Sequence, residues 1–115
     1  MKVRLANTKH FNGLMVLSFG VYGDGSTAIK INAEDGEPMG KATVCIEQHG
    51  YVPPEGFVVI KNFEENEGML DALVDAGVIE RPMEIKQFVS GWGGGLTDFP
   101  VCKLTDFVMR KIAQS

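Results

Sequence analysis

The sequence predicts an α+β fold in which a mostly antiparallel sheet of about five to six strands carries two helices on one face. Segments that alternate apolar and polar residues, as half-buried strands do, run through residues 14–47. Apolar residues instead recur at helical spacing in residues 63–76 and 105–114. The order of strands, helix, strands and helix is typical of helices gathered on one side of an antiparallel sheet.

The composition favours a single folded domain spanning residues 1–115. Hydrophobic residues make up 44% and charged residues 23%, which are ordinary proportions for a soluble globular protein. The start of the chain lacks a signal-peptide pattern, and the longest apolar run, residues 14–17, is far shorter than the roughly 20 residues of a membrane helix. We therefore expect a cytoplasmic protein with no membrane contact, in which Cys45 and Cys102 stay reduced.

The first half of the chain is predicted to form a three-stranded meander. Residues 14–22 alternate with their odd-numbered positions toward the core, and the Gly-Asp-Gly-Ser run at 23–26 supplies a hairpin turn. Alternation resumes around residues 28–32, breaks at the turn-forming residues 35–38, and returns at 41–47 as a third strand.

The helix at 63–76 carries signals at both ends. Asn62 and Glu65 have the spacing of a capping box, which would satisfy backbone N–H groups of the first turn. Gly77 suits the left-handed residue that ends a Schellman motif. Gly68 costs about 1 kcal/mol relative to alanine inside a helix. It therefore marks either a later helix start or a close backbone contact.

The second half of the chain adds three more predicted strands and the closing helix. Residues 57–60 and 85–89 have the composition of short strands, and residues 99–103 form the last one. Pro100 predicts that this last strand lies at a sheet edge or begins there, because proline cannot donate to a ladder. Thr105 suits the N-cap of the closing helix.

The charge balance disfavours direct binding to nucleic acid. Eleven Lys and Arg residues stand against fifteen Asp and Glu residues, for a net charge of −4, and the basic residues do not cluster. Binding through phosphates requires a concentrated basic surface. The densest acidic run, at residues 64–67, is typical of the solvated face of an amphipathic helix.

The candidates for metal or nucleophilic chemistry are few and widely spaced. His10, Cys45, His49 and Cys102 show neither CxxC nor HxxxH spacing. Cys45 and His49 could lie on the same side of a strand, but neither cysteine directly precedes a helix that would activate a thiolate. We expect no metal, no cofactor and no catalytic residues, and the sequence favours a protein that is not an enzyme.

The glycine-rich run at residues 91–95 is the strongest candidate for a binding site. It lacks the Gly-Lys-Ser/Thr ending of a phosphate loop and is followed by a strand rather than a helix. A structural hairpin connection is the simplest interpretation. The functional alternative is a binding loop in which Trp92, flanked by Gly93 and Gly94, acts as an aromatic anchor for a partner.

Residues 59–78 contain a lysine, a short polar-acidic run, Asn-Glu-Gly and a helix that ends in Ala-Gly, and residues 100–104 read Pro-Val-Cys-Lys-Leu. In these features the chain resembles a family of small uncharacterised proteins from bacterial phages, plasmids and conjugative elements. The resemblance covers the second half better than the first. It implies a mobile-element accessory protein and brings no catalytic residues. The Asn-Glu-Gly motif makes Asn66 and Glu67 candidate binding residues, although a helix start beside a close backbone approach explains the motif equally well.

The leading hypothesis is therefore a non-enzymatic protein-binding module that contacts another protein, or itself as a homo-oligomer, through the Trp92 loop and the neighbouring sheet edge. Host-defence interference and element maintenance are the roles that fit the resemblance. The alternative is a small enzyme or ligand-binding protein with a pocket between sheet and helices. Its polar groups would come from Glu65, Glu67, Cys45 or His49.

Overall fold

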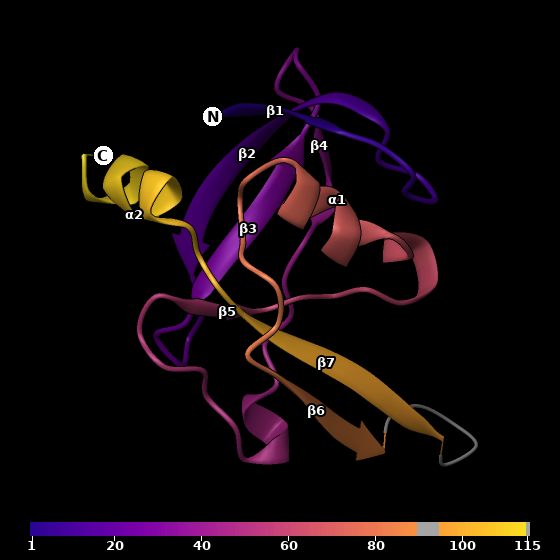
Figure 1. Ribbon diagram of the computed structural model, residues 1–115, viewed down its shortest axis with the longest axis vertical. Helices are drawn as coiled ribbons and strands as arrows, with labels where there is room; N and C mark the ends of the chain where they lie inside the picture. Colours follow the sequence, from indigo (N-terminus) through magenta and orange to yellow (C-terminus); the bar gives the residue numbers. More distant parts are fainter. Residues whose placement is uncertain (90–94, 115) are drawn as a thin grey trace.

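The computed structural model describes residues 1–89 and 95–114. These residues form an α+β fold with two antiparallel sheets, in the strand orders β1-β2-β3-β4 and β5-β7-β6 (Figure 1). The elements in chain order are β1 (Lys2–Leu5), β2 (Gly13–Val21), β3 (Thr27–Asn32), β4 (Pro38–Lys41), the 3-10 turn η1 (Glu47–His49), β5 (Phe57–Val59), the 3-10 turn η2 (Glu64–Asn66), α1 (Met69–Asp75), β6 (Glu84–Val89), β7 (Leu96–Lys103) and α2 (Asp106–Ala113).

The predicted hairpin of β2 and β3 is confirmed. The N–H of Tyr22 donates to the carbonyl of Ser26 over 2.8 Å and closes the turn. Met15 and Leu17, on the odd-numbered face of β2, are buried as the alternation predicts. Val21 shares that face but is 74% exposed, because it belongs to the last residue pair before the turn and lies beyond the core.

The prediction of one sheet of five to six strands is wrong, because the chain leaves the first sheet after β4. The hydroxyl oxygen of Thr43 accepts the N–H of Ile29 over 3.0 Å, so a side chain takes the place of a ladder carbonyl. Residues 42–44 then bond to the segment around β5: the N–H of Lys61 donates to Ala42 and that of Val44 to Val59. The predicted meander is present as β2, β3 and β4, but its third strand is Pro38–Lys41 rather than 41–47, and residues 42–44 connect the two sheets.

Both helices pack against the four-stranded sheet. Leu73 of α1 and Val108 of α2 are fully buried in one cluster with Leu17 and Ile29 of that sheet. The same cluster includes Cys102 of β7, so one end of the three-stranded sheet also contributes to this core. The two predicted helices are therefore both present, and both pack on the larger of the two sheets.

Helix α1 begins at Met69 rather than near residue 63. Residues 64–66 form the 3-10 turn η2, and Gly68 occupies the N-cap with φ +91°. A side chain at residue 68 would overlap the backbone carbonyl oxygen of Asn7. Gly68 therefore marks both a later helix start and a close backbone contact, the two alternatives that its position in the sequence suggested. A glycine N-cap has no side chain that could cap the helix. The side-chain oxygen of Asn62 instead accepts the backbone N–H of Leu70 over 2.8 Å.

The predicted end of α1 and the predicted start of α2 are confirmed. Gly77 has φ +76°, and the N–H groups of Gly77 and Val78 donate to the carbonyls of Val74 and Leu73, which is the bonding pattern of a Schellman motif. Thr105 is the N-cap of α2, and its hydroxyl oxygen accepts the N–H of Val108 over 3.5 Å.

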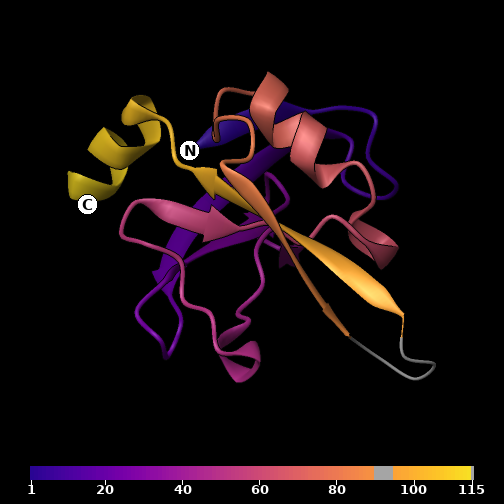
Figure 2. The same cartoon turned by 60° about the horizontal axis from the view of Figure 1, so that its bottom comes forward.

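The second sheet ends in an arm that extends away from the helices (Figures 1 and 2). We define the arm as β6 together with residues 96–100 of β7, which pair in register from Ile85↔Pro100 to Val89↔Leu96. Pro100 lies inside the middle strand of its sheet, not at a strand start. It is tolerated because β5 ends there: β5 pairs only as far as Val101.

We expect Gly68→Ala to destabilise the fold far more than Gly77→Ala. Both residues are left-handed, which costs an alanine about 1–2 kcal/mol. A methyl group at residue 77 meets no other atom within 4 Å, whereas one at residue 68 collides with the backbone at Asn7. Denaturant unfolding should show an additional loss of about 1–3 kcal/mol for Gly68→Ala. Equal losses would contradict the close contact.

Candidate functional site

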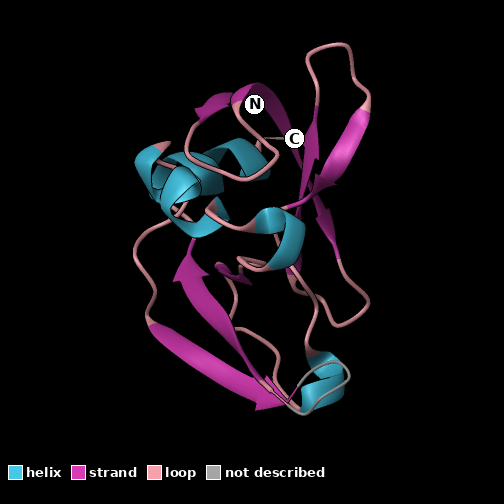
Figure 3. Ribbon diagram, turned by 90° about the vertical axis from the view of Figure 1, so that its right-hand side faces the viewer, coloured by secondary structure: helices cyan, strands magenta, loops and turns pink. Residues whose placement is uncertain are grey.

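The inner face of the arm is covered by aromatic packing. The pleat directs Lys86, Phe88 and Phe99 toward residues 46–51. The ring of His49 stacks on that of Phe88 with centroids 4.7 Å apart, and Phe88 lies 5.9 Å from Phe99. The turn η1, which contains His49, accordingly lies against the arm near the end of β6 (Figure 3).

The outer face of the arm carries apolar side chains that nothing in the described chain covers. Ile85 is 53% exposed, Val89 58% and Leu96 65%. Eight large hydrophobic side chains are exposed in the described residues, and these three and Met83 account for half of them. Such a concentration differs from the scattered apolar residues of an ordinary surface and is typical of an interaction site.

Polar groups are sparse on this face and are paired with one another. The side-chain amide of Gln87 donates to Asp98 Oδ1 over 2.7 Å at the centre of the arm. A hollow of about 580 Å³ lies between this face and the start of α1. It is lined by Asn62, Phe63, Leu70, Ile85, Gln87, Leu96, Thr97, Asp98 and Pro100. Only Asp98 among these lining residues is titratable, so the lining offers no pair of acid and base side chains.

The outer strand β6 also presents backbone groups along an open edge. The carbonyl of Pro100 accepts the N–H of Ile60, so it points away from β6. Its opposite residue, Ile85, therefore belongs to a pair that is not hydrogen-bonded within the arm. By the alternation of an antiparallel ladder, Ile85, Gln87 and Val89 direct their N–H and C=O groups away from β7.

The predicted binding residues Trp92, Gly93 and Gly94 lie outside the described residues. In the sequence they connect β6 to β7, so the sheet edge predicted to accompany them is that of β6. The patterns did not identify Ile85, Val89 or Leu96 individually. The sequence did contain a signal. Residues 85–89 include apolar side chains at odd and at even positions, so both faces of the strand are partly apolar, and a two-stranded arm can bury only one face.

Asn66 and Glu67, the other predicted binding residues, have structural roles. Asn66 is buried, and its side-chain amide donates to the carbonyl of Lys41 over 2.6 Å. The carbonyl of Glu67 accepts the N–H of Lys9, while its side chain is exposed. The Glu67 carbonyl and Gly68 thus hold the segment after β1 against the start of α1, and Asn66 ties the same turn to the end of β4.

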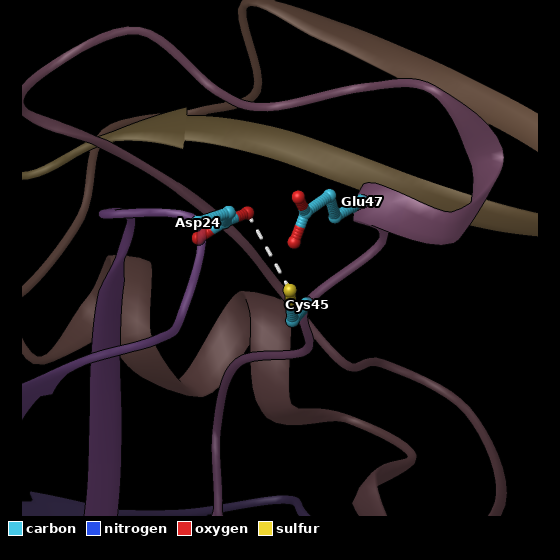
Figure 4. A group of neighbouring side chains, drawn as sticks. All are labelled: Asp24, Cys45 and Glu47. Carbon is cyan, nitrogen blue, oxygen red and sulfur yellow. Dashed lines mark hydrogen bonds between the residues drawn. The ribbon is translucent and has the colours of Figure 1, made fainter.

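Cys45 lies beside two carboxylates, and its hydrogen bond goes to one of them rather than to His49 (Figure 4). The thiol donates to Asp24 Oδ2 over 3.4 Å. The backbone N–H of Glu47 lowers the pKa of the thiol, but burial and the bond to Asp24 outweigh it, so the pKa of Cys45 is raised. A thiol with a raised pKa stays protonated near neutral pH and is a poor nucleophile.

Asp24, Cys45 and Glu47 are also the described residues that could hold a metal ion. One ligand atom from each lies within 4.8 Å of the other two. Zn–S and Zn–O bonds of about 2.3 and 2.1 Å would bring neighbouring ligands to about 3.5 Å. The hydrogen bond from the thiol to Asp24 accounts for the arrangement without a metal.

Burial raises the pKa of the second thiol, Cys102, to about 11.

No protein-family model, curated protein or solved structure matches the chain. Within residues 1–89 and 95–114, neither helix has the length and apolar character needed to cross a bilayer. The arm geometry is therefore the main basis for a functional argument.

We expect Asp24→Asn to speed alkylation of Cys45 and to move its rate–pH profile to lower pH. Removing the carboxylate stabilises the thiolate relative to the thiol, which lowers the pKa of Cys45. Iodoacetamide labelling followed by peptide mass spectrometry measures the rate. Asp35→Asn is the matched control, because Asp35 accepts a backbone N–H in the neighbouring hairpin turn just as Asp24 does. An unchanged rate in Asp24→Asn would contradict the assigned contact.

Proposed function

We propose that this protein is a binding module that contacts another protein through the outer face of the arm. The observation that carries the proposal is the cluster of Ile85, Val89 and Leu96, each more than half exposed, on a pair of strands whose opposite face is packed. Packing on the inner side fixes the arm in place, so a partner meets a surface that is already ordered. Binding then loses little conformational entropy.

The apolar cluster supplies part of the free energy of a specific contact. Full burial of a Val, Leu or Ile side chain is worth about 1.5–3 kcal/mol, so covering the exposed half of each contributes roughly 1 kcal/mol. The hollow beside α1 extends the surface and could receive one apolar side chain of the partner. The pair of Gln87 and Asp98 supplies hydrogen-bonding groups at the centre.

The alternative function, a small ligand-binding protein, has two supporting observations, both of them hollows. The first hollow lies between the three-stranded sheet and α1, where that alternative predicted a pocket. The polar groups named for that alternative are divided. Cys45 and Glu65 both line a second hollow of about 370 Å³, whereas His49 stacks on Phe88. The hollow beside α1 is lined by none of the four named residues.

The biological role proposed with this activity is that of a mobile-element accessory protein, in host-defence interference or element maintenance. The support is the resemblance of residues 59–78 and 100–104 to such proteins. A small binding module suits a role in which a host protein is occupied or redirected.

We expect Ile85→Thr combined with Leu96→Thr to weaken capture of the partner from host extract by about thirtyfold, the equivalent of about 2 kcal/mol. Threonine is β-branched and has a high strand propensity, so the strands should persist. Tagged protein, quantitative mass spectrometry of captured proteins and thermal unfolding provide the measurements.

Val21→Thr is the control, because Val21 is more exposed than either arm residue but lies at the end of β2. It should capture the partner as the native protein does. If the arm double variant captures the same proteins at native strength while folding normally, the outer face is not the binding site.

A further inference from the structure

β6 differs from the other outer strands of the two sheets. β1 and β4 have four residues each and β5 has three, whereas β6 has six. The others carry features that discourage pairing: β1 has two exposed cationic side chains, and β4 contains a proline. Along β6, Ile85, Gln87 and Val89 direct backbone donors and acceptors outward, as the ladder parity requires.

We propose that the occupant of this edge is the β6 strand of a second copy of the chain, paired antiparallel about a two-fold axis at Gln87. Gln87 would face Gln87 of the second copy, and Ile85 would face its Val89. All three of these residues direct their backbone groups outward, so each facing pair can exchange two hydrogen bonds. The inference deepens the proposed function by naming one partner of the arm, and it rests on that function.

The matching of facing side chains favours a second copy in this register. On the outer face the pairing sets apolar residues opposite apolar residues and one uncharged amide opposite another. On the inner face it sets Lys86 opposite Phe88, and Lys86 already lies 3.5 Å from Glu84 of its own chain. A shift by two residues in one direction would instead place Lys86 directly opposite Lys86 of the second copy, which is unfavourable. A shift by two in the other direction would place Gln87 opposite Val89 and so set an amide against an apolar side chain. The Gln87-centred register places no charge opposite a like charge.

Pairing through β6 would enlarge the binding face. Two three-stranded sheets would join into one sheet of six strands, with the outer faces of both arms side by side. The Ile85 and Val89 side chains of the two copies would then form two apolar pairs, one on each side of the central Gln87 pair. A single strand pair buries little surface by the standard of permanent dimers, so we expect a dissociation constant on the order of micromolar.

Sedimentation over a range of concentrations tests the dimer with Gln87→Pro. Proline removes the outward N–H of residue 87, which makes no bond within the arm, and it is tolerated at an edge facing solvent. We expect the dissociation constant to rise at least about tenfold, since two central hydrogen bonds are lost. Gln87→Thr keeps the N–H and loses only the contact to Asp98, so it should dimerise normally. A native protein that stays monomeric throughout would overturn the proposal.

The register is tested by two charge variants, which also serve if Gln87→Pro fails to fold. Ile85→Lys with Val89→Lys puts lysine opposite lysine twice and should be monomeric. Ile85→Lys with Val89→Glu puts lysine opposite glutamate twice and should dimerise. Loss of the dimer in both variants, or in neither, would overturn the Gln87-centred register.

The outcomes separate the dimer from the proposed function. A monomeric native protein that still captures a host partner through Ile85 and Leu96 would remove the inference and leave the function. A dimer of the native protein whose arm variants capture host proteins at native strength would remove the function and leave the dimer.

Discussion

The connection of the two sheets through residues 42–44 is the constraint on which the rest of the structure depends. The buried hydroxyl of Thr43 replaces a backbone carbonyl toward Ile29 and also pairs with the hydroxyl of Tyr22 over 2.9 Å. The backbone of the same three residues bonds to Val59 and Lys61 on the other side. Because the first sheet ends there, β5, β6 and β7 form a separate sheet, and its far end lies outside the main core.

An arm in this position can bury only one of its two apolar faces. Period-two alternation sends Phe88 and Phe99 to one side, where residues 46–51 cover them, and it sends Ile85, Val89 and Leu96 to the other. The aromatic packing holds the arm in place and leaves the second apolar face exposed. The same pleat determines which backbone groups of β6 point outward, so side-chain exposure and the open edge have one origin.

Local chemistry made much of the fold predictable, and long-range contacts account for what was missed. The hairpin turn after β2, the left-handed Gly77 and the Thr105 cap follow from residues close in sequence, and the structure confirms them. The division into two sheets depends on a side-chain bond between Thr43 and Ile29, which no local pattern encodes. The late start of α1 depends on Asn7, some sixty residues from Gly68 in the chain. At the site, the sequence indicated the region beside β6 but not the individual apolar residues, since their exposure depends on which face residues 46–51 cover.

Amide hydrogen exchange along β6, followed over a range of protein concentrations, tests most directly whether the arm is an interaction element. The N–H groups of Lys86 and Phe88 point toward β7 and should be protected at every concentration. Those of Ile85 and Gln87 should exchange quickly in dilute solution and become protected as the concentration rises. Fast exchange of Ile85 and Gln87 at all concentrations, with or without a captured partner, would contradict the account.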